Sequence, residues 1–309
     1  MNVAGFQYQG AWTGDTSNMP TLAPLSADPL LVDGSLALLD PSDSANPWIA
    51  GVPAPGVKIP NLAWDRASPR VGGGDDQALA FTWNNSLISS GAGQDAIIER
   101  TAKGGLHVIV SQVANAASDY AQLDMAAAIK SYILANPGHS FYASCWFTTT
   151  RRTKYSGYPQ FMISNITSAT GNYLMFGSSS STNEFINPGA GVHYGGSRVA
   201  GNTGGLGTPT FKNISTIPSN GTSWSGTIPS ATANLITSIF PWANAAPFNG
   251  LVQNQSPSYI AYRWYFEDLT VSGRPYATVD AIDFGLYSAA FSSGGRFNAD
   301  TYTNPSILP

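Results

Sequence analysis

The residues that could support nucleophilic catalysis are few in this chain. Cys145 is the single cysteine among 309 residues and lies within the stretch FYASCWFTTT. Alternation along this stretch predicts a strand that turns Cys145 toward the core, where a thiol is a small hydrophobic group. The sequence also contains no G-x-S-x-G motif. We therefore expect no catalytic nucleophile.

Neighbouring carboxylates do not form an acid–base pair in the predicted elements. Glu267 and Asp268 are adjacent in a predicted strand, so they point to opposite faces. Asp95 and Glu99 lie in one extended segment, about 13 Å apart, which is too far for the two carboxyl groups of a glycosidase. A glycan hydrolase or lyase, with carboxylates brought together from distant segments, stays an alternative.

The usual motifs for metals and cofactors do not occur. The three histidines, His107, His139 and His193, have no second ligand at helical or hairpin spacing. The sequence has no His-Glu-x-x-His motif and no calcium loop of the D-x-D-x-D-G type. The glycine runs at 72–74 and 204–207 lack a P-loop lysine. We expect neither a metal ion nor a cofactor.

Aromatic residues among Asn, Ser and Gly indicate another kind of site. Flat rings stack on the apolar faces of sugars, and amide groups bond to their hydroxyls. The region of residues 178–256 contains Trp224 and Trp242 in such surroundings. These two tryptophans are the candidate glycan contacts. The alternative is that they hold long loops against the sandwich or against a neighbouring subunit.

The composition is poor in charge. Charged residues make up 10% of the chain and aromatic residues 12%, with 32 Gly and 21 Pro. This is typical of an all-β protein with many turns, and the low charge indicates a surface partly covered in use. We find no basic patch for nucleic acid, no apolar run suited to membrane insertion and no signal peptide. The single cysteine fits synthesis in a reducing cytoplasm.

The N-terminal part differs from the rest in proline and in charge. Residues 1–65 hold eight of the 21 prolines and predict an extended arm, while residues 66–309 predict a β-sandwich domain. Residues 1–60 also carry five Asp and one Lys, whereas acids and bases balance in the remainder. Whether the arm clasps a neighbour or packs on its own domain stays open.

Runs of β-forming residues predict the main strands. Residues 95–112 contain two such runs joined by a Lys-Gly-Gly turn, which predicts a hairpin. The segments 139–152 and 257–269 predict long strands. Alternation in the later strand places one set of residues on a single face: Ile260, Tyr262, Trp264 and Phe266. Residues 178–256 predict long Gly- and Ser-rich loops with a few short strands.

Two segments predict short helices. Apolar residues from Leu123 to Ile133 recur at helical spacing, and the Asn-Pro-Gly at 136–138 stops the run. Near the C-terminus, Thr278 predicts the start of a second helix and the glycine pair at 294–295 its end. The expected inner stripe of this helix is Val279, Ile282, Leu286, and Ala289 or Ala290.

The C-terminal stretch has a distinctive order of motifs. An aromatic strand ends in Glu-Asp-Leu and is followed by Ser-Gly-Arg, a Val-Asp-Ala-Ile-Asp helix and Gly-Gly-Arg-Phe, before a tail that closes on Pro309. Over residues 258–309 this order resembles the C-terminus of structural proteins of tailed bacteriophages. The resemblance implies an antiparallel jelly-roll β-sandwich of the concanavalin-like type, and a location in the virion.

From these features together we expect a non-enzymatic structural component of a tailed-bacteriophage particle. The preferred role is a tail fibre, baseplate or receptor-binding part with a lectin-like sandwich, and the closest alternative is a capsid decoration (cement) protein. The expected partners are other virion proteins, copies of the chain in a homotrimer, and host surface glycan. Arg274, Asp280 and Arg296 are the candidate residues that tie the terminal helix into an interface.

Overall fold

The computed structural model describes most of the chain outside its first 27 residues and several internal segments. The described residues are 28–43, 52, 54–136, 138–154, 160–165, 172–178, 185–186, 195–197, 206–215, 235–245 and 252–309.

The strands belong to two sheets, which we call sheet A and sheet B. Sheet A contains β1 (Ser35–Leu39), β4 (Ala96–Arg100), β5 (Leu106–Val110), β7 (Phe141–Arg151), β11 (Gly195–Ser197), β12 (Pro209–Ser215) and β14 (Ser258–Asp268). Sheet B contains β2 (Lys58–Ile59), β3 (Phe81–Asn85), β6 (Tyr120–Asp124), β8 (Gln160–Asn165), β9 (Asn172–Ser178), β10 (Phe185–Ile186) and β13 (Leu235–Ala243). The helices are α1 (Trp64–Ala67), α2 (Ala127–Ala135), α3 (Leu269–Ser272), α4 (Tyr276–Phe291) and the 3-10 helix η2 (Pro305–Ile307).

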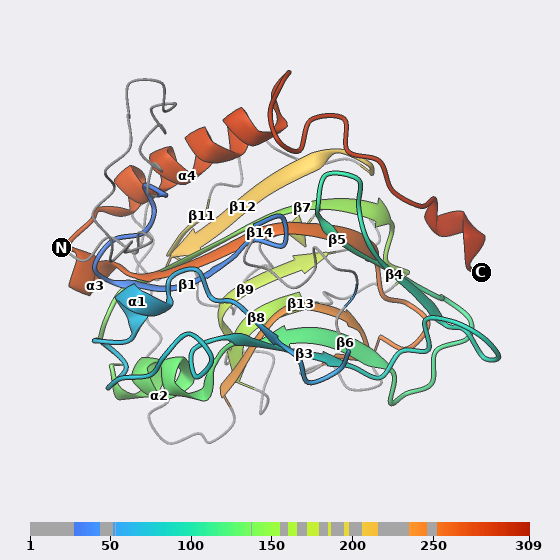
Figure 1. Ribbon diagram of the computed structural model, residues 1–309, viewed down its shortest axis with the longest axis horizontal. Helices are drawn as coiled ribbons and strands as arrows, with labels where there is room; N and C mark the ends of the chain where they lie inside the picture. The colour runs from blue at the N-terminus through green and yellow to red at the C-terminus, as the bar shows by residue number, and fades with distance from the viewer. Residues whose placement is uncertain are drawn as a thin grey trace, which may run out of the picture.

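The two sheets stack, and α4 lies along the outer face of sheet A (Figure 1). Sheet A has the order β11-β12-β7-β14-β5-β4, while β1 pairs with the second half of β14, on the side where β5 pairs with the first half. Sheet B has the order β10-β9-β8-β13-β6-β3-β2. All pairs between the described strands are antiparallel. The prediction of a mostly antiparallel two-sheet protein is confirmed.

Apolar side chains form two layers. The larger core fills the space between the sheets, with Trp83 and Trp242 from sheet B and Trp264 and Phe266 from sheet A. A second layer, between sheet A and the C-terminal segment, includes Trp146, Phe211, Tyr262, Tyr287 and Phe297. Sheet A is therefore covered on both faces, which explains why every residue of β14 is buried.

The two long strands match the sequence prediction to different degrees. In β7, Phe141, Ala143, Cys145 and Phe147 face the core while Tyr142 and Trp146 face the C-terminal segment, so the predicted alternation is confirmed. In β14, Trp264 and Phe266 face the core as expected, but so do Tyr259 and Ala261, whereas Ile260 and Tyr262 face outward. The register of β14 on β7 shifts between Ala261 and Arg263, and this bulge reverses the alternation.

The described part of the N-terminal arm packs on the sandwich. The strand β1 is buried throughout and pairs with β14, and β2 pairs with β3 at the edge of sheet B. Residues 28–43 are therefore part of the β-sandwich, although the sequence predicted that they belong to the arm of residues 1–65. Residues 1–27 and 44–51 lie outside the described residues.

Both predicted helices exist with different boundaries. Leu123 lies in β6, and helix α2 begins only at Ala127. Helix α4 begins at Tyr276, before the predicted Thr278, and its buried residues are Val279, Asp283, Tyr287 and Ala290. The inner stripe is rotated from the predicted one because Asp283 enters the interior. The region 178–256 contains two substantial strands, β12 and β13, besides segments outside the described residues.

Candidate functional site

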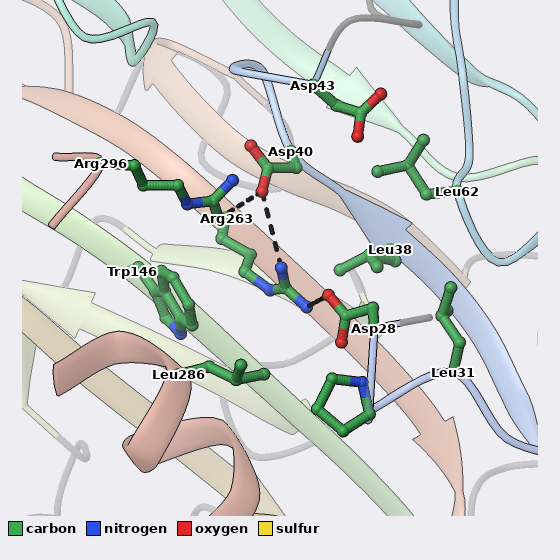
Figure 2. A pocket seen from close by; sticks show the side chains of 11 residues that line it. Asp28, Leu31, Leu38, Asp40, Asp43, Leu62, Trp146, Arg263, Leu286 and Arg296 are labelled. Atoms are coloured by element: carbon green, nitrogen blue, oxygen red, sulfur yellow. Dashed lines mark hydrogen bonds and ion pairs between the residues drawn. The ribbon is translucent and has the colours of Figure 1, made fainter. Parts of the chain in front are cut away.

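A cavity of about 530 Å³ lies where β1, β7 and β14 meet α4 and the C-terminal segment (Figure 2). We call it the arginine cleft. Its walls combine aliphatic residues with five charged side chains. The lining residues are Asp28, Pro29, Leu31, Leu38, Asp40, Asp43, Leu62, Trp146, Arg263, Leu286 and Arg296.

Arg263 stands at the centre of the cleft because of the bulge in β14. Tyr259 and Ala261 face the core, so strict alternation would have placed Arg263 there as well. The register shift between Ala261 and Arg263 instead turns the guanidinium toward the cleft. The bulge thus keeps a charge out of the apolar core.

Two carboxylates hold the buried guanidinium. Arg263 Nη2 lies 2.5 Å from Asp28 Oδ2, and Arg263 Nη1 lies 3.5 Å from Asp40 Oδ2. The side chain of Arg263 is only 5% exposed. Burial alone would lower the pKa of Arg263, but Asp28 and Asp40 raise it above its usual value. The cation therefore stays charged inside the protein.

Asp40 also binds the C-terminal segment. Its Oδ2 atom lies 2.5 Å from Arg296 Nη2, and Arg296 Nη1 donates to Ser42 Oγ at 3.0 Å. Asp40 Oδ1 accepts from the backbone N–H and the hydroxyl of Ser42. One buried carboxylate thus joins β14, the turn after β1 and the segment after α4.

Trp146 forms the floor of the cleft and connects it to α4. The guanidinium carbons of Arg263 and Arg296 lie 4.9 and 5.8 Å from the centre of the Trp146 ring, within cation–π range. Trp146 Nε1 donates to Asp283 Oδ1 at 3.0 Å, and the Tyr142 hydroxyl donates to Asp283 Oδ2 at 2.9 Å. Burial raises the pKa of Asp283, while Arg263 and these donors oppose the shift. Helix α4 is therefore anchored on sheet A by a buried polar network.

A second ion pair, near the arginine cleft, also binds the segment before β1. Arg274 forms a two-point contact with Glu267, with Nε–Oε1 at 3.0 Å and Nη2–Oε2 at 2.5 Å. Arg274 also donates to the carbonyls of Pro29 and Leu30. The glutamate is fully buried, and the arginine side chain is 14% exposed. Arg263 and Arg274 therefore both hold residues 28–30, at the start of the described segment before β1.

The interface candidates from the sequence all have partners within their own chain. Arg274 and Arg296 take part in the contacts above, and Asp280 accepts from Asn213 Nδ2 at 2.7 Å. They tie the terminal helix to sheet A and to the segment around β1. A role in contacts between chains stays a prediction.

The structure describes only one of the two tryptophans that the sequence predicted as glycan contacts. Trp242 is fully buried in the core, with its ring stacked 4.6 Å from that of Tyr259, so it is not placed at a surface where a sugar could bind. Its environment explains this, because Phe240 and Trp83 pack against the same ring. This corrects the sequence-based interpretation of Trp242. Trp224 lies outside the described residues.

The remaining reactive side chains have structural surroundings. Cys145 is buried, as the sequence pattern predicts, and burial raises the pKa of its thiol. His107 is buried between Glu99 and Thr150, and His139 contacts Asp268. His193 lies outside the described residues. In the described part of the chain, no three His, Cys, Asp or Glu side chains are grouped as a metal site, and no helix is long and apolar enough to cross a membrane.

One feature of the sequence, the distribution of charge, indicated the arginine cleft although no motif did. The acidic surplus of residues 1–60 supplies Asp28, Asp33 and Asp40. Each of these pairs with an arginine from the rest of the chain. An acidic segment that precedes a domain with balanced charge therefore indicated where the arginines would find partners. No family model matches the sequence, and no curated protein is detectably similar to it.

Proposed function

We propose that this protein is a non-enzymatic structural component of a tailed-bacteriophage particle, and that it belongs to the tail as a fibre, baseplate or receptor-binding part. The observation that carries the proposal is the arginine cleft, whose arginines pair with carboxylates of the same chain. These pairs connect the two ends of the described chain across sheet A. Charges that are paired within the chain and connect its distant segments make the fold rigid, which suits a structural protein.

The chemistry of the cleft supports a structural role over a catalytic one. Acid–base catalysis on glycans needs one carboxyl group that holds a proton beside a second that does not. Here Asp28 and Asp40 are held against the same guanidinium, at 2.5 and 3.5 Å. The side chains that line the described cleft include no Cys, His or Ser.

The resemblance of residues 258–309 to phage structural proteins supports the location. In the fold this stretch is one continuous block, with β14 in the middle of sheet A and α4 packed on its outer face. The jelly-roll, concanavalin-like connectivity is part of the proposal, supported by the antiparallel sheets and the crossings between them. Synthesis in the host cytoplasm and assembly with other virion proteins, as a homotrimer, complete it. Host glycan remains a proposed ligand, with Trp224 as its candidate contact.

Quantitative mass spectrometry of purified particles, combined with cryo-EM, tests this function. A few to dozens of copies at the tail would support the proposal. Hundreds of copies on the shell would identify a decoration protein instead. Absence of the protein from intact particles would contradict a structural role and favour the glycan-cleaving alternative.

A further inference from the structure

Three loops meet around two aspartates at a place separate from the arginine cleft. Asp95 ends the loop from β3 to β4, Asn115 and Asp119 lie in the loop from β5 to β6, and Asn244 follows β13. Hydrogen bonds hold these residues together. Asn115 Nδ2 donates to the carbonyl of Asp95, and the backbone N–H of Asn244 donates to the carbonyl of Asp119 at 2.9 Å.

The two carboxyl groups are in contact. The Asp119 carboxyl lies within hydrogen-bonding reach of the Asp95 carboxyl, and Asp95 is only 2% exposed. Two carboxylates in contact repel each other unless a proton or a cation lies between them. The loop sequences 86–95 and 111–119 contain no Lys or Arg that could neutralise the pair.

Two amide oxygens of the residues that join these loops have no partner among the described residues. Asn115 Oδ1 and Asn244 Oδ1 are buried and accept no hydrogen bond, in residues that are 4% and 3% exposed. The Nδ2 atoms of these amides donate to the carbonyls of Asp95 and Ala116. Exchanging oxygen and nitrogen would set an oxygen against a carbonyl, so these contacts fix the amide orientation. Buried acceptors of this kind are normally satisfied by a donor group, an ordered water or a cation.

We propose that Asp95, Asp119, Asn115 and Asn244 bind a calcium ion that joins the three loops. All four supply oxygen, as carboxylate or amide carbonyl, and these are the ligands that Ca²⁺ takes, with water or backbone carbonyls completing the six to eight positions. The set contains no sulfur or imidazole, so it does not suit zinc or copper. The cation would neutralise the two carboxylates and supply a partner for both amide oxygens.

The test uses the full-length chain after dialysis against EDTA, with CaCl₂ as the only added ligand. At pH 7.5, we expect 1 mM Ca²⁺ to raise Tm by roughly 5 °C, as for a ligand well above its Kd. Equimolar Mg²⁺ should raise Tm less, because Mg²⁺ demands a tighter octahedral shell. Calorimetric titration should give about one site per chain.

Asp95→Asn is the informative variant because it keeps the acceptor for the Ile88 N–H and should still fold. In EDTA its Tm should equal or exceed that of the parent, since the repulsion with Asp119 is gone, but its calcium response should be lost. The matched control, Asp76→Asn, changes an exposed carboxylate and should keep the full response. Asn244→Ala should weaken calcium binding at least tenfold without removing charge.

A different pattern would overturn the proposal. If the two aspartates share a proton, Tm should rise when the pH is lowered from 7.5 to 5, and CaCl₂ should have no effect at either pH. An equal calcium response in the parent chain and in Asp95→Asn would also contradict the site.

Discussion

Asp28 and Arg263 form an ion pair between positions 235 residues apart, with Asp28 Oδ2 2.5 Å from Arg263 Nη2. The pair is largely shielded from water, since the two side chains are 22% and 5% exposed. Loss of one member of such a pair leaves the other charge buried without compensation, which is costly. The stability of the sandwich should therefore depend on a few charged residues that lie outside its apolar core.

Asp40→Asn tests this dependence. The substitution removes the charge shared by Arg263 and Arg296, and we expect a loss of about 3 kcal/mol in the free energy of unfolding, measured by urea denaturation. Asp33→Asn is the matched control, because the Asp33–Arg70 pair is exposed and should contribute less than about 1 kcal/mol. Equal losses in the two variants would show that burial of the pair does not matter.

Gly295 and Gly285 offer a pair of substitutions with opposite expected effects. A Cβ atom at Gly295 would lie 2.2 Å from the carbonyl oxygen of Ala289, whereas one at Gly285 would meet no atom within 4 Å. Gly295→Ala should therefore destabilise the turn after α4 strongly. Gly285→Ala should raise the free energy of unfolding by up to about 1 kcal/mol, because glycine is a poor helix former. Thermal unfolding of both variants would decide, and a stabilising Gly295→Ala would contradict this packing.

Glu99 should make stability depend on pH. It accepts the backbone N–H and the hydroxyl of Thr303 and contacts His107, so it fixes the C-terminal tail to β4. Burial raises the pKa of Glu99, but the bonds from His107 and Thr303 outweigh burial and lower the pKa to about 2, from 4.5. The stabilisation is thus complete above pH 4.5 and is lost as the pH falls toward 2.

Glu99→Gln should remove that dependence. Tm is measured for the variant and for the parent chain from pH 7 to pH 2. At pH 7 the Tm of the variant should be lower than that of the parent chain, and at pH 2 the two Tm values should be nearly equal. A constant difference across the range would show that the Glu99 charge is not what holds the tail.

Trp242→Ala should act on folding rather than on ligand binding. Truncation of a fully buried tryptophan leaves a large cavity, and we expect a loss of about 3–5 kcal/mol. Trp224→Ala should instead lower binding on a glycan array, because Trp224 is the proposed glycan contact. Intact glycan binding in a folded Trp224→Ala protein would remove this residue from the proposal.

The sequence predicted features that arise from local patterns. The hairpin of β4 and β5 follows from two β-rich runs and a turn, and the two faces of β7 follow from strict alternation between Phe141 and Phe147. The helix α4 was expected within two residues of its start. These elements need no information beyond their own residues.

The features that the sequence did not predict arise from pairing between distant segments. The bulge that aims Arg263 at the cleft results from the register of β14 on β7. In β13, Phe240 and Ala243 have φ angles of 48° and 54°, and the register on β6 shifts between Ile239 and Trp242. This irregularity buries the adjacent residues Ile239 and Phe240 in the same core, although alternation would place them on opposite faces. The partners of Arg263 and Arg296 likewise depend on the position of β1 beside β14.

Hydrogen exchange tests most directly whether the arginine cleft holds the N-terminal segment and the C-terminal helix on sheet A as one unit. The measurement compares the parent chain with Arg263→Met, and with Arg70→Met as control, by mass spectrometry at pH 7. We expect Arg263→Met to speed exchange in peptides from 28–43 and from 276–297 together, while peptides from β3 and β6 stay protected. Faster exchange confined to the neighbourhood of residue 263, with both distant segments unchanged, would contradict the account.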